Sequence, residues 1–364
     1  MAKTPLKIAL FLPALNDGGA ERVFVNLANG FTQKGHAVNL ILIKNQGPYK
    51  AQAPHDITTT EIGRSPLKLA NHLRRAKPDI LISALPAANL MAIAACAISK
   101  TKLIITEHAF FSVYDDLAKS PKTKLRNAAM KHLYKGADQI MAVSQGAAED
   151  LARACNIPTE KIKVIPNPID LEAIKDRAGQ PTNHPWFKNK QAPVILSAGR
   201  LSPPKDFKTL IYAFKKIQED TEIKLIIIGE GVQRNDLQNL INNLNLQDRI
   251  DMPGFQSNPF NFMAAGDLFV LSSLKEGFGN VIIESLACGT PVIATNCPGG
   301  PAEILENGKW GTLVPPQNIE ALAQAMEKGL ETPPTINLQS RAADFAQDKI
   351  IDNYLQMIEN VLHE

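Results

Sequence analysis

The feature that most constrains this chain is a repeated alternation of short apolar runs with longer helical stretches. The first run spans residues 8–12, and in the helical stretch 20–33 that follows, Val23, Leu27 and Phe31 recur at i, i+4 and i+8. Strands that alternate with helices form parallel βαβ units, so the chain is expected to belong to the α/β class. Further apolar runs predict strands at 37–43, 79–83, 102–106, 139–144 and 162–167, and then at 193–200, 223–231, 267–273, 291–296 and 311–316.

The alternation divides the chain into two halves. The chain has 364 residues, which is too long for one compact core and suits two domains of about 150–180 residues. The rhythm is lost over 169–192, which we interpret as a linker between an N-terminal domain, 1–168, and a C-terminal domain, 193–345. Residues 346–364 are expected to form a final helix, with a return to the N-terminal domain as one option. Two doubly wound, Rossmann-like domains bind ligands at the carboxyl ends of their strands, so an active site is expected in a cleft between them.

Residues 80–98 imitate a membrane span, because they form a stretch of 19 residues without a charge, which is about the length a span needs. The stretch contains Ser83, Pro86 and Asn89, and much of it is alanine. A strand followed by a buried helix explains this composition better than a membrane-spanning helix does.

Cysteine usage and the N-terminus both favour the cytoplasm. No pair of cysteines has C-x2-C spacing, so neither a zinc site nor a disulfide framework is predicted. The apolar stretch after Lys7 runs into Asn16 rather than into a small-residue cleavage site, so no secretion signal is expected. The four cysteines are Cys96, Cys155, Cys288 and Cys297.

Charge is unevenly distributed between the halves. Residues 1–180 carry 24 Lys and Arg against 15 Asp and Glu, whereas residues 181–364 carry 15 against 21. Six of the basic residues lie within 119–135, a stretch without an acid in which Leu125, Ala129 and Leu133 recur at helical spacing. An apolar stripe with basic flanks is typical of a membrane-surface helix, although a core-packed helix with a solvated basic face is an alternative. The residues expected to contact an anionic membrane are Lys122, Lys124, Arg126 and Lys131. Nucleic acid is not expected, since no recognised module accompanies these charges.

A Gly-Gly turn follows the first predicted strand. Gly18 and Gly19 let the backbone approach a ligand closely, and the helix that begins near Ala20 presents its N-terminal amides to an anion. An ordinary strand–helix turn is the alternative. The dinucleotide fingerprint G-x-G-x-x-G is absent here, which argues against an NAD-binding domain.

Two cations follow the first predicted strand of the second half. Arg200 offers a fork for paired phosphate oxygens and Lys205 a compact charge, so together they are suited to a diphosphate. Two solvated loop charges are the alternative. The chain has no D-x-D pair, Asp170 and Glu172 being the nearest approach to one, so no metal ion is expected at the diphosphate.

Two glutamates lie eight positions apart in the stretch 276–300. Glu276 precedes a glycine-flanked turn, and Glu284 lies among apolar residues on a helix predicted to span 280–288 and to end at Gly289. Because burying an unpaired charge is costly, Glu284 requires a partner. Carboxylates suit the vicinal hydroxyls of a ribose or a hexose. The alternative is a solvated Glu276 and a structural ion pair at Glu284. The amides of Phe278, Gly279 and Asn280 are expected to point toward the ligand.

These motifs together resemble the signature of the retaining GT-B glycosyltransferases of family 4, which use nucleotide sugars. The E-x7-E pair lies within "EGFGNVIIESLACGTPVIAT". Further matches are "GGAERV" at 18–23, "TEH" at 106–108, "AGRLSPPKD" at 198–206 and "IIGEG" at 227–231. The likeness covers essentially the whole chain. It extends in particular to bacterial enzymes that lengthen lipopolysaccharide cores or polyprenyl-diphosphate-linked glycans.

The resemblance implies a role for each of these residues. Glu284 would bind the donor's ribose and Glu276 the transferred sugar, while Arg200 and Lys205 would hold the diphosphate and stabilise the leaving group. His108 would contact the transferred sugar near the reacting carbon, although a histidine after a strand is also a common structural residue. The other donor-binding positions would be Gly18, Gly19, Gly229, Phe255, Phe278, Gly279 and Asn280. Asp206 departs from the family pattern, because many members have glycine there, and it leaves the shape of the loop open.

The expected activity is retaining, metal-independent transfer of a hexosyl or N-acetylhexosaminyl group from a nucleotide sugar. The resemblance favours a UDP-sugar as donor and a lipid-linked glycan or lipopolysaccharide-type acceptor, with no cofactor beyond the donor. The enzyme is expected in the cytoplasm, peripheral on the inner face of the cytoplasmic membrane. Two alternatives stay open, a sugar-nucleotide epimerase of related fold and a non-catalytic membrane-surface binding protein.

Overall fold

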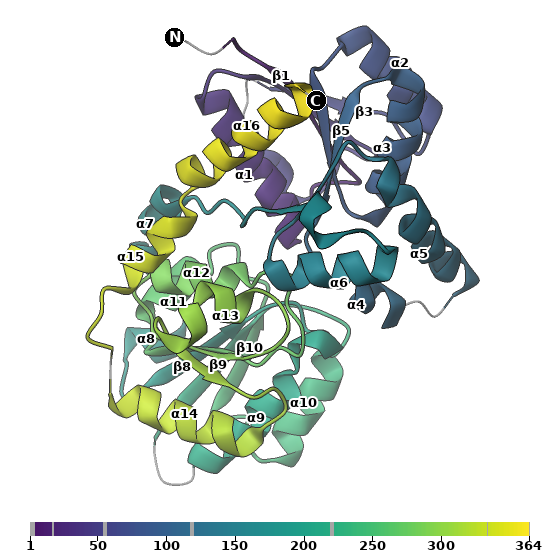
Figure 1. Ribbon diagram of the computed structural model, residues 1–364. Coiled ribbons are helices and arrows are strands. Elements are labelled where there is room, and N and C mark those ends of the chain that lie inside the picture. Colours follow the sequence, from purple (N-terminus) through teal and green to yellow (C-terminus); the bar gives the residue numbers. More distant parts are fainter. Residues whose placement is uncertain are drawn as a thin grey trace. The chain divides into compact units, whose positions relative to one another are not determined.

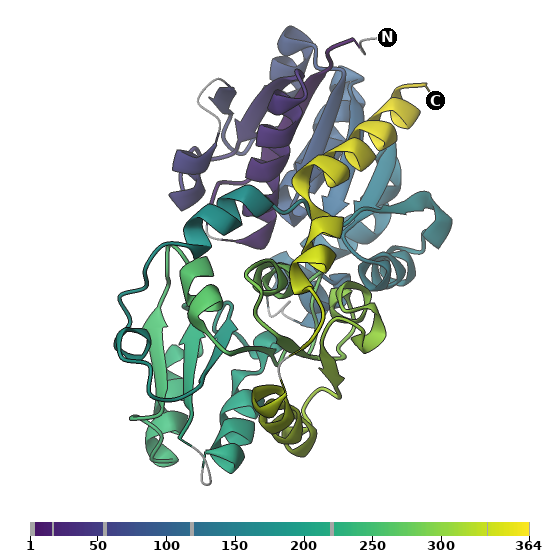
Figure 2. The ribbon, with the colours of Figure 1, turned by 90° about the vertical axis from the view of Figure 1, so that its left-hand side faces the viewer.

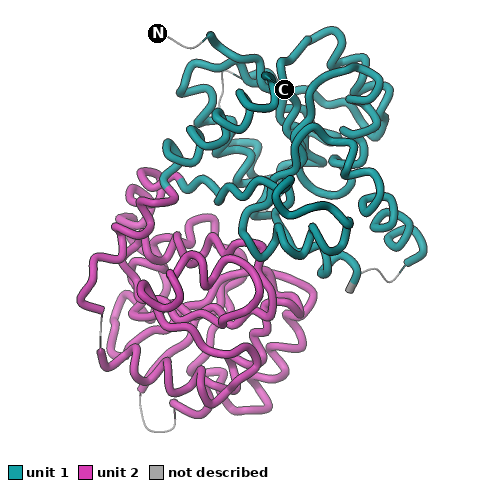
Figure 3. Tube along the Cα trace, in the orientation of Figure 1, with its two compact units in different colours: residues 1–169, 346–364 teal, residues 170–345 magenta. Residues whose placement is uncertain are grey.

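The computed structural model (Figures 1 and 2) describes residues 4–16, 18–53, 57–116, 120–218, 222–332 and 334–363. The chain forms two compact units. The first contains residues 1–169 and 346–364, and the second contains residues 170–345 (Figure 3).

The first unit is built on a seven-stranded parallel sheet with the order β3-β2-β1-β4-β5-β6-β7. Its strands are β1 (Lys7–Leu12), β2 (Ala37–Leu42), β3 (Thr58–Glu61), β4 (Ile80–Ala84), β5 (Lys102–Glu107), β6 (Gln139–Ala142) and β7 (Ile162–Val164). Its helices are α1 (Gly19–Gln33), α2 (Pro66–Ala76), α3 (Pro86–Ser99), α4 (Phe111–Asp116), α5 (Pro121–Leu133), α6 (Gln145–Cys155) and α16 (Gln347–His363), with short 3-10 turns that include η2 (Tyr134–Gly136).

The second unit is built on a six-stranded parallel sheet with the order β10-β9-β8-β11-β12-β13. Its strands are β8 (Val194–Ala198), β9 (Lys224–Ile228), β10 (Ile250–Gly254), β11 (Leu268–Leu271), β12 (Val292–Thr295) and β13 (Thr312–Val314). Its helices are α7 (Leu171–Ala178), α8 (Pro185–Lys188), α9 (Phe207–Ile217), α10 (Arg234–Asn243), α11 (Phe260–Ala265), α12 (Asn280–Ala287), α13 (Gly300–Ile304), α14 (Ile319–Glu331) and α15 (Leu338–Ala342). Short 3-10 turns include η4 (Pro203–Lys205), η5 (Glu306–Gly308) and η6 (Ala343–Phe345).

In each sheet, strands are added to one side of the first strand and then to its other side. β1 lies between β2 and β4, and β8 lies between β9 and β11. In sheets of this order the crevice at the carboxyl ends of the two central strands is where ligands bind. The expected α/β fold of two doubly wound units is therefore confirmed, and each unit has one such position.

The uncharged stretch 80–98 forms β4 and α3, as expected. All five residues of β4 are buried, which a strand covered on both faces requires. α3 is 14 residues long and begins at Pro86, where proline's missing N–H costs nothing. No helix in the described part of the chain is long and apolar enough to cross a membrane.

The eleven strands expected from the apolar runs are all present, with ends that differ by a few residues. Two further strands, β3 and β10, were not expected, and both lie at sheet edges. The segment 169–192, interpreted as a linker, contains α7 and α8, and it belongs to the second unit from Asp170 onward.

The final helix α16 belongs to the first unit, where it lies beside α1 (Figures 1 and 2). Lys34 Nζ lies 2.8 Å from Asp352 Oδ1, and Phe31 packs edge-on against Tyr354 with ring centroids 6.3 Å apart. Ile169 and Ala346 are bridge partners, so the chain leaves and re-enters this unit at adjacent positions.

Candidate active site

The loop 199–206 follows β8 at the crevice of the second unit. Arg200 is exposed, and Lys205 is half-buried at the end of η4. Asp206 has φ 45° and ψ 47°, a left-handed conformation that glycine adopts freely and aspartate tolerates. Its carboxylate also caps α9, because the backbone N–H of Thr209 donates to Asp206 Oδ1 at 3.4 Å. The Thr209 hydroxyl donates to Asp206 Oδ2 at 2.7 Å as well. Aspartate thus gives this turn the left-handed shape that glycine adopts easily.

Lys205 and Glu276 form an ion pair that joins this loop to the loop after β11. Lys205 Nζ lies 2.5 Å from Glu276 Oε1, and the Ser273 hydroxyl donates to the same oxygen at 2.5 Å. The side chain of Glu276 is 9% exposed and that of Lys205 22%, so Glu276 is not a solvated charge. Because burial of an unpaired carboxylate is costly, the two partners are what allow Glu276 to lie at the crevice.

The loop 276–280 leads from Glu276 into α12. Gly279 has φ 100° and ψ 49°, a conformation that a side chain would strain. Asn280 is the first residue of α12, so the amides of this turn lie at the end of a helix where anions are stabilised. Glu284 is buried one turn further along. The second unit therefore places Lys205, Glu276 and the start of α12 together.

The loop 276–280 rests on the segment that follows α14. Phe278 is buried and packs edge-on against Phe345, with ring centroids 5.6 Å apart. The guanidinium of Arg341 lies 4.7 Å from the centroid of the Phe345 ring. Gly300 at the start of α13 has no room for a side chain, because an added Cβ would meet the carbonyl oxygen of Phe278.

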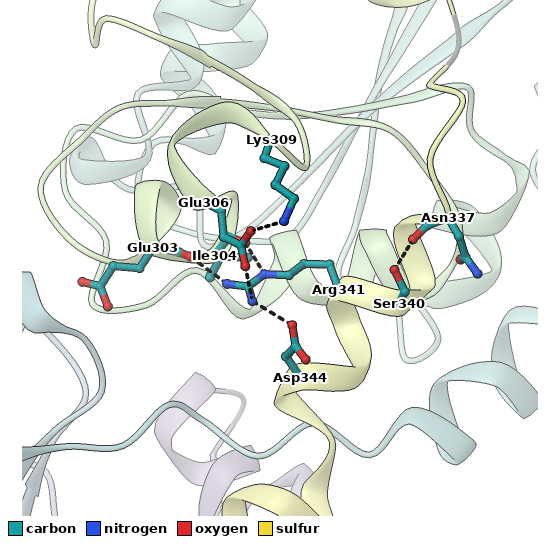
Figure 4. Close-up of polar contacts among 8 residues, drawn as sticks. All are labelled: Glu303, Ile304, Glu306, Lys309, Asn337, Ser340, Arg341 and Asp344. Atoms are coloured by element: carbon teal, nitrogen blue, oxygen red, sulfur yellow. Dashed lines mark hydrogen bonds and ion pairs between the residues drawn. The ribbon is translucent and has the colours of Figure 1, made fainter.

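Arg341 connects the segments that support the loop 276–280 (Figure 4). Its Nε donates to the carbonyl oxygen of Ile304 at 2.7 Å and its Nη2 to that of Glu303 at 2.8 Å. Its Nη1 lies 2.8 Å from Asp344 Oδ2 and 3.0 Å from Glu306 Oε1. The planar fork thus occupies carbonyl groups at the end of α13 and pairs with two carboxylates. Nothing in the sequence pattern singled out Arg341, Phe345 or Ser273.

Gly229 follows β9 and Phe255 follows the edge strand β10, both on the other side of β8 from β11. Gly229 has φ 137°, and a Cβ there would lie 2.0 Å from the carbonyl oxygen of Gly199, so only glycine fits. Phe255 follows β10 and is 50% exposed. An exposed aromatic ring at the carboxyl end of a strand offers a face for stacking.

Gly18 and Gly19 form the start of α1 in the first unit. Gly18 is its N-cap, and a Cβ at Gly18 would meet the carboxylate of Glu21. A Cβ at Gly19 would have no atom within 4 Å. Gly19 is exposed, and open space surrounds the position that a side chain would take there.

His108 follows β5 in the same unit. Its ring packs edge-on against Phe24 of α1, with centroids 6.0 Å apart, and its Nε2 lies 3.0 Å from Thr106 Oγ1. Because the Thr106 hydroxyl donates its proton to the Ser83 carbonyl oxygen, it accepts from His108 Nε2–H, which leaves Nδ1 as an acceptor. Burial lowers the pKa of His108 to about 4, and the side chain of Asn167 opposes this shift. His108 is therefore neutral at physiological pH.

The predicted basic helix is α5, although Lys119 lies outside the described residues. α5 packs through Asn127 and Met130, whereas Leu125 and Leu133 of the expected apolar stripe are 72% and 47% exposed. The apolar stripe expected from the sequence is therefore not the face of α5 that packs on the core. The alternative of a core-packed helix with a solvated basic face is not contradicted, because Met130 of α5 belongs to the core.

The four basic residues of α5 differ in their surroundings. Lys122 and Lys124 are exposed. Lys131 Nζ pairs with Asp115 Oδ2 at 2.8 Å, and Arg126 donates to Asn127 Oδ1 and lies over the ring of Tyr114.

Comparison with known proteins identifies the class. The model of glycosyl transferases group 1 matches residues 182–349, and that of glycosyltransferase family 4 matches residues 17–173. The chain belongs to this family of GT-B glycosyltransferases, and it is an enzyme of that class.

Two curated relatives match most of the chain. The N-acetylgalactosamine-N,N'-diacetylbacillosaminyl-diphospho-undecaprenol 4-alpha-N-acetylgalactosaminyltransferase of Campylobacter jejuni is 32% identical, over 89% of this chain and 90% of that protein. The lipopolysaccharide core biosynthesis glycosyltransferase LpsE of Rhizobium meliloti is 30% identical, over 94% and 96%.

A solved structure shares the fold. HepE of Anabaena, in complex with UDP and glucose, has a TM-score of 0.81 at 23% identity, over 97% of this chain and 99% of that one.

Proposed function

We propose that the protein transfers a hexosyl or N-acetylhexosaminyl group from a UDP-sugar to a lipid-linked glycan or lipopolysaccharide-type acceptor, with retention of configuration and without a metal ion or other cofactor. The observation that carries this proposal is the Lys205–Glu276 pair at the crevice of the second unit. A cation suited to phosphate and a carboxylate suited to sugar hydroxyls are in contact there.

The residues divide the work according to their chemistry. Lys205 and Arg200 supply two positive charges to the diphosphate, so the leaving group is stabilised without a metal ion. Glu284, buried on α12, accepts from the ribose hydroxyls, and Glu276 accepts from a hydroxyl of the transferred sugar. Neutral His108 contributes a hydrogen bond to that sugar without adding charge.

The acceptor class is inferred from the relatives. The Campylobacter jejuni enzyme is named for a diphospho-undecaprenol acceptor and the Rhizobium meliloti enzyme for the lipopolysaccharide core. Both names describe glycans built on a lipid. An acceptor of this kind requires an enzyme that works at a membrane surface.

α5 is the element that we assign to that surface, on the inner face of the cytoplasmic membrane. Its exposed Leu125 and Leu133 provide apolar contacts, and Lys122 and Lys124 provide exposed charges. An amphipathic helix with these properties lies in the plane of a membrane interface. Lys131 and Arg126 are expected to contribute less, because each already contacts another side chain of this unit.

The test is a thermal-shift screen of UDP- and GDP-sugars, followed by transfer assays with and without EDTA. A bound donor at 100 times its dissociation constant stabilises by about 2.7 kcal/mol. We expect a UDP-sugar to be selected, transfer to a diphospho-undecaprenol-linked glycan, an α-linked product from an α-linked donor, and no loss of activity in EDTA. Restoration of an EDTA-sensitive activity by magnesium or manganese would refute metal independence. Conversion of the UDP-sugar into its epimer without any acceptor would favour the epimerase instead.

A further inference from the structure

Glu107, the last residue of β5, is a carboxylate that the proposed chemistry does not use. It is 1% exposed. Tyr134 donates from its hydroxyl to Glu107 Oε1 at 2.5 Å, Asn89 donates from Nδ2 to the same oxygen at 3.1 Å, and Tyr114 donates to Oε2 at 3.3 Å. Both oxygens of the buried carboxylate therefore accept hydrogen bonds, three in all, so the fold provides partners for this group.

The three donors come from three different elements. Asn89 lies on α3, Tyr114 on α4, and Tyr134 on the turn η2 that continues α5. Arg126 of α5 lies over the Tyr114 ring, with its guanidinium 5.9 Å from the ring centroid. Glu107 is therefore the point at which α4 and the end of α5 are fastened to the central sheet.

The neighbour of Glu107 in the chain is His108. Glu107 pairs with Ala142 of β6 as the final residue of β5, so its position fixes the place at which His108 leaves the sheet. The side chain of Asn89, whose Nδ2 donates to Glu107, also accepts at Oδ1 from the Ser83 hydroxyl at 2.7 Å. The carbonyl oxygen of Ser83 accepts from the hydroxyl of Thr106, which is the partner of His108. One buried network thus supports both the α4–α5 side and His108.

We propose that Glu107 is a positioning residue of this transferase, which holds α4 and α5 against the end of β5 and thereby sets the acceptor side of the first unit relative to His108. This inference rests on the proposed function, because it assigns α5 and His108 to the acceptor and the transferred sugar. Glu107 itself is too deeply buried to touch either substrate.

The network also gives the junction a pH dependence near neutrality. Burial raises the pKa of Glu107 to about 7, against the hydrogen bonds from Tyr134, Asn89 and Tyr114 and the charge of Arg126, which lower it. Above that pH the ionised carboxylate accepts charge-assisted bonds from all three donors. Below it the protonated group must donate one bond instead, and its attraction to Arg126 is lost. The titratable or charged groups that face Glu107, or face Tyr114 beside it, are Glu21 of α1, Tyr114 of α4, Arg126 of α5, Tyr134 of η2 and Cys155 of α6.

The first experiment needs no substrate. Glu107→Gln keeps the shape and removes the charge, and we expect faster hydrogen–deuterium exchange confined to α4 and α5. The melting temperature of Glu107→Gln relative to wild type should also rise between pH 5 and pH 8. The reason is that a carboxyl whose pKa is raised in the folded state contributes less to the stability of wild type as pH rises from its unfolded-state pKa toward its folded-state pKa. Gln does not titrate, so the variant has no such loss. Unchanged exchange in α4 and α5, or a pH-independent difference in melting temperature, would overturn the proposal.

The second experiment measures the reaction, with N-acetylgalactosamine-N,N'-diacetylbacillosaminyl-diphospho-undecaprenol as the acceptor probe. In wild type the acceptor KM should fall as pH rises through about 7, whereas Glu107→Gln should keep a KM about tenfold higher at every pH. The donor KM should stay within twofold. An equal rise of donor and acceptor KM would show a general structural loss and overturn the proposal. Absence of transfer to this or any lipid-linked acceptor would count against the proposed function, while the exchange result would still decide whether Glu107 anchors α4 and α5.

Tyrosine variants provide a readout that survives if Glu107→Gln fails to fold. Tyr114→Phe and Tyr134→Phe each delete a hydrogen bond that lowers the pKa of Glu107, so each should move the pH transition of stability, and of the acceptor KM, to higher pH. Tyr354→Phe is the control, matched most closely to Tyr134→Phe, since Tyr354 is as fully buried as Tyr134 and its hydroxyl has no hydrogen-bond partner among the described residues. A transition that Tyr114→Phe and Tyr134→Phe leave in place, or that Tyr354→Phe moves equally, would contradict the role of Glu107.

Discussion

The Lys205–Glu276 pair can be measured as a coupling energy. Lys205→Met leaves the carboxylate of Glu276, 9% exposed, without its lysine partner and with only the hydrogen bond from Ser273 of the two contacts described above. The loss of one hydrogen bond between charged groups costs about 2 kcal/mol. Glu276→Gln keeps an acceptor for Ser273 and leaves a lysine that water can reach, so we expect about 1 kcal/mol. The double variant should cost no more than about 1 kcal/mol, which gives a coupling of about 2 kcal/mol.

Urea unfolding of the four proteins measures this cycle. In a unit of this size a change of 1 kcal/mol corresponds to about 2–4 °C in melting temperature, so Lys205→Met should melt about 4–8 °C lower. Lys208→Met is the control, because Lys208 is exposed on the next helix and should change little. Additive effects, with the double variant as unstable as the sum of the single ones, would refute the pair in the ligand-free protein.

The same variants test what each residue of the pair contributes to the binding of UDP. Lys205 must be shared with, or released by, Glu276 when a diphosphate arrives, so Glu276→Gln should bind free UDP at least as tightly as wild type and still lose turnover. Lys205→Met should weaken UDP by about tenfold or more, since it removes a charge-assisted contact of at least about 1.4 kcal/mol. Calorimetric titration with UDP checks both. Weaker UDP binding by Glu276→Gln would show that the carboxylate supports the nucleotide and not the sugar.

Three further outcomes test the assignments above. Glu284→Gln should weaken the binding of UDP and of the UDP-sugar alike by about 10–100-fold, which is the cost of losing a hydrogen bond to a charged group. Equal affinities of the variant and of wild type for UDP would contradict the assignment of Glu284 to the ribose. Arg341→Met should lower the free energy of unfolding in urea by about 2–3 kcal/mol and should weaken UDP binding, because the loop 276–280 loses its support. Lys309→Met should do neither. Identical melting temperatures of the two variants would contradict the supporting role of Arg341. Binding to anionic vesicles should fall steeply as salt shortens the Debye length from about 8 Å to about 3 Å. Replacing Lys122 and Lys124 with Gln should weaken this binding by about 2 kcal/mol without changing the affinity for UDP. A protein that does not bind such vesicles at low salt would contradict the membrane assignment.

The parts of the fold that the sequence predicts are those with a simple physical signature. Central strands such as β4 and β8 are buried on both faces, so they are continuous apolar runs. The strands that were missed are β3, "TTTE", which is largely exposed, and β10, "IDMPG", which contains a proline. Edge strands are half solvated and tolerate both features, so their sequences do not differ from those of loops.

The candidate site divides in a similar way. Glu276, Glu284, Lys205 and Gly279 could be identified because each belongs to a local pattern of fixed spacing. Ser273, Arg341 and Phe345 could not, because their importance comes from partners that are distant in the chain and common in type. Glu107 is intermediate, since it stands inside the matched segment "TEH" while its partners lie 18 residues before it and 27 after it.

The route of the chain has a consequence for how this protein can be divided. The second unit is a continuous segment, 170–345, inserted into the first, whose two pieces meet where Ile169 and Ala346 are bridged. Ile351, Tyr354 and Ile358 of α16 are completely buried. A fragment that stops at residue 169 therefore lacks part of its own core, and shortening the chain after residue 345 damages the N-terminal half of the sequence rather than trimming the C-terminal one. A peptide of α16 supplied separately is the natural complement of such a fragment, and the inserted unit is the piece that can be exchanged between relatives with two cuts made side by side.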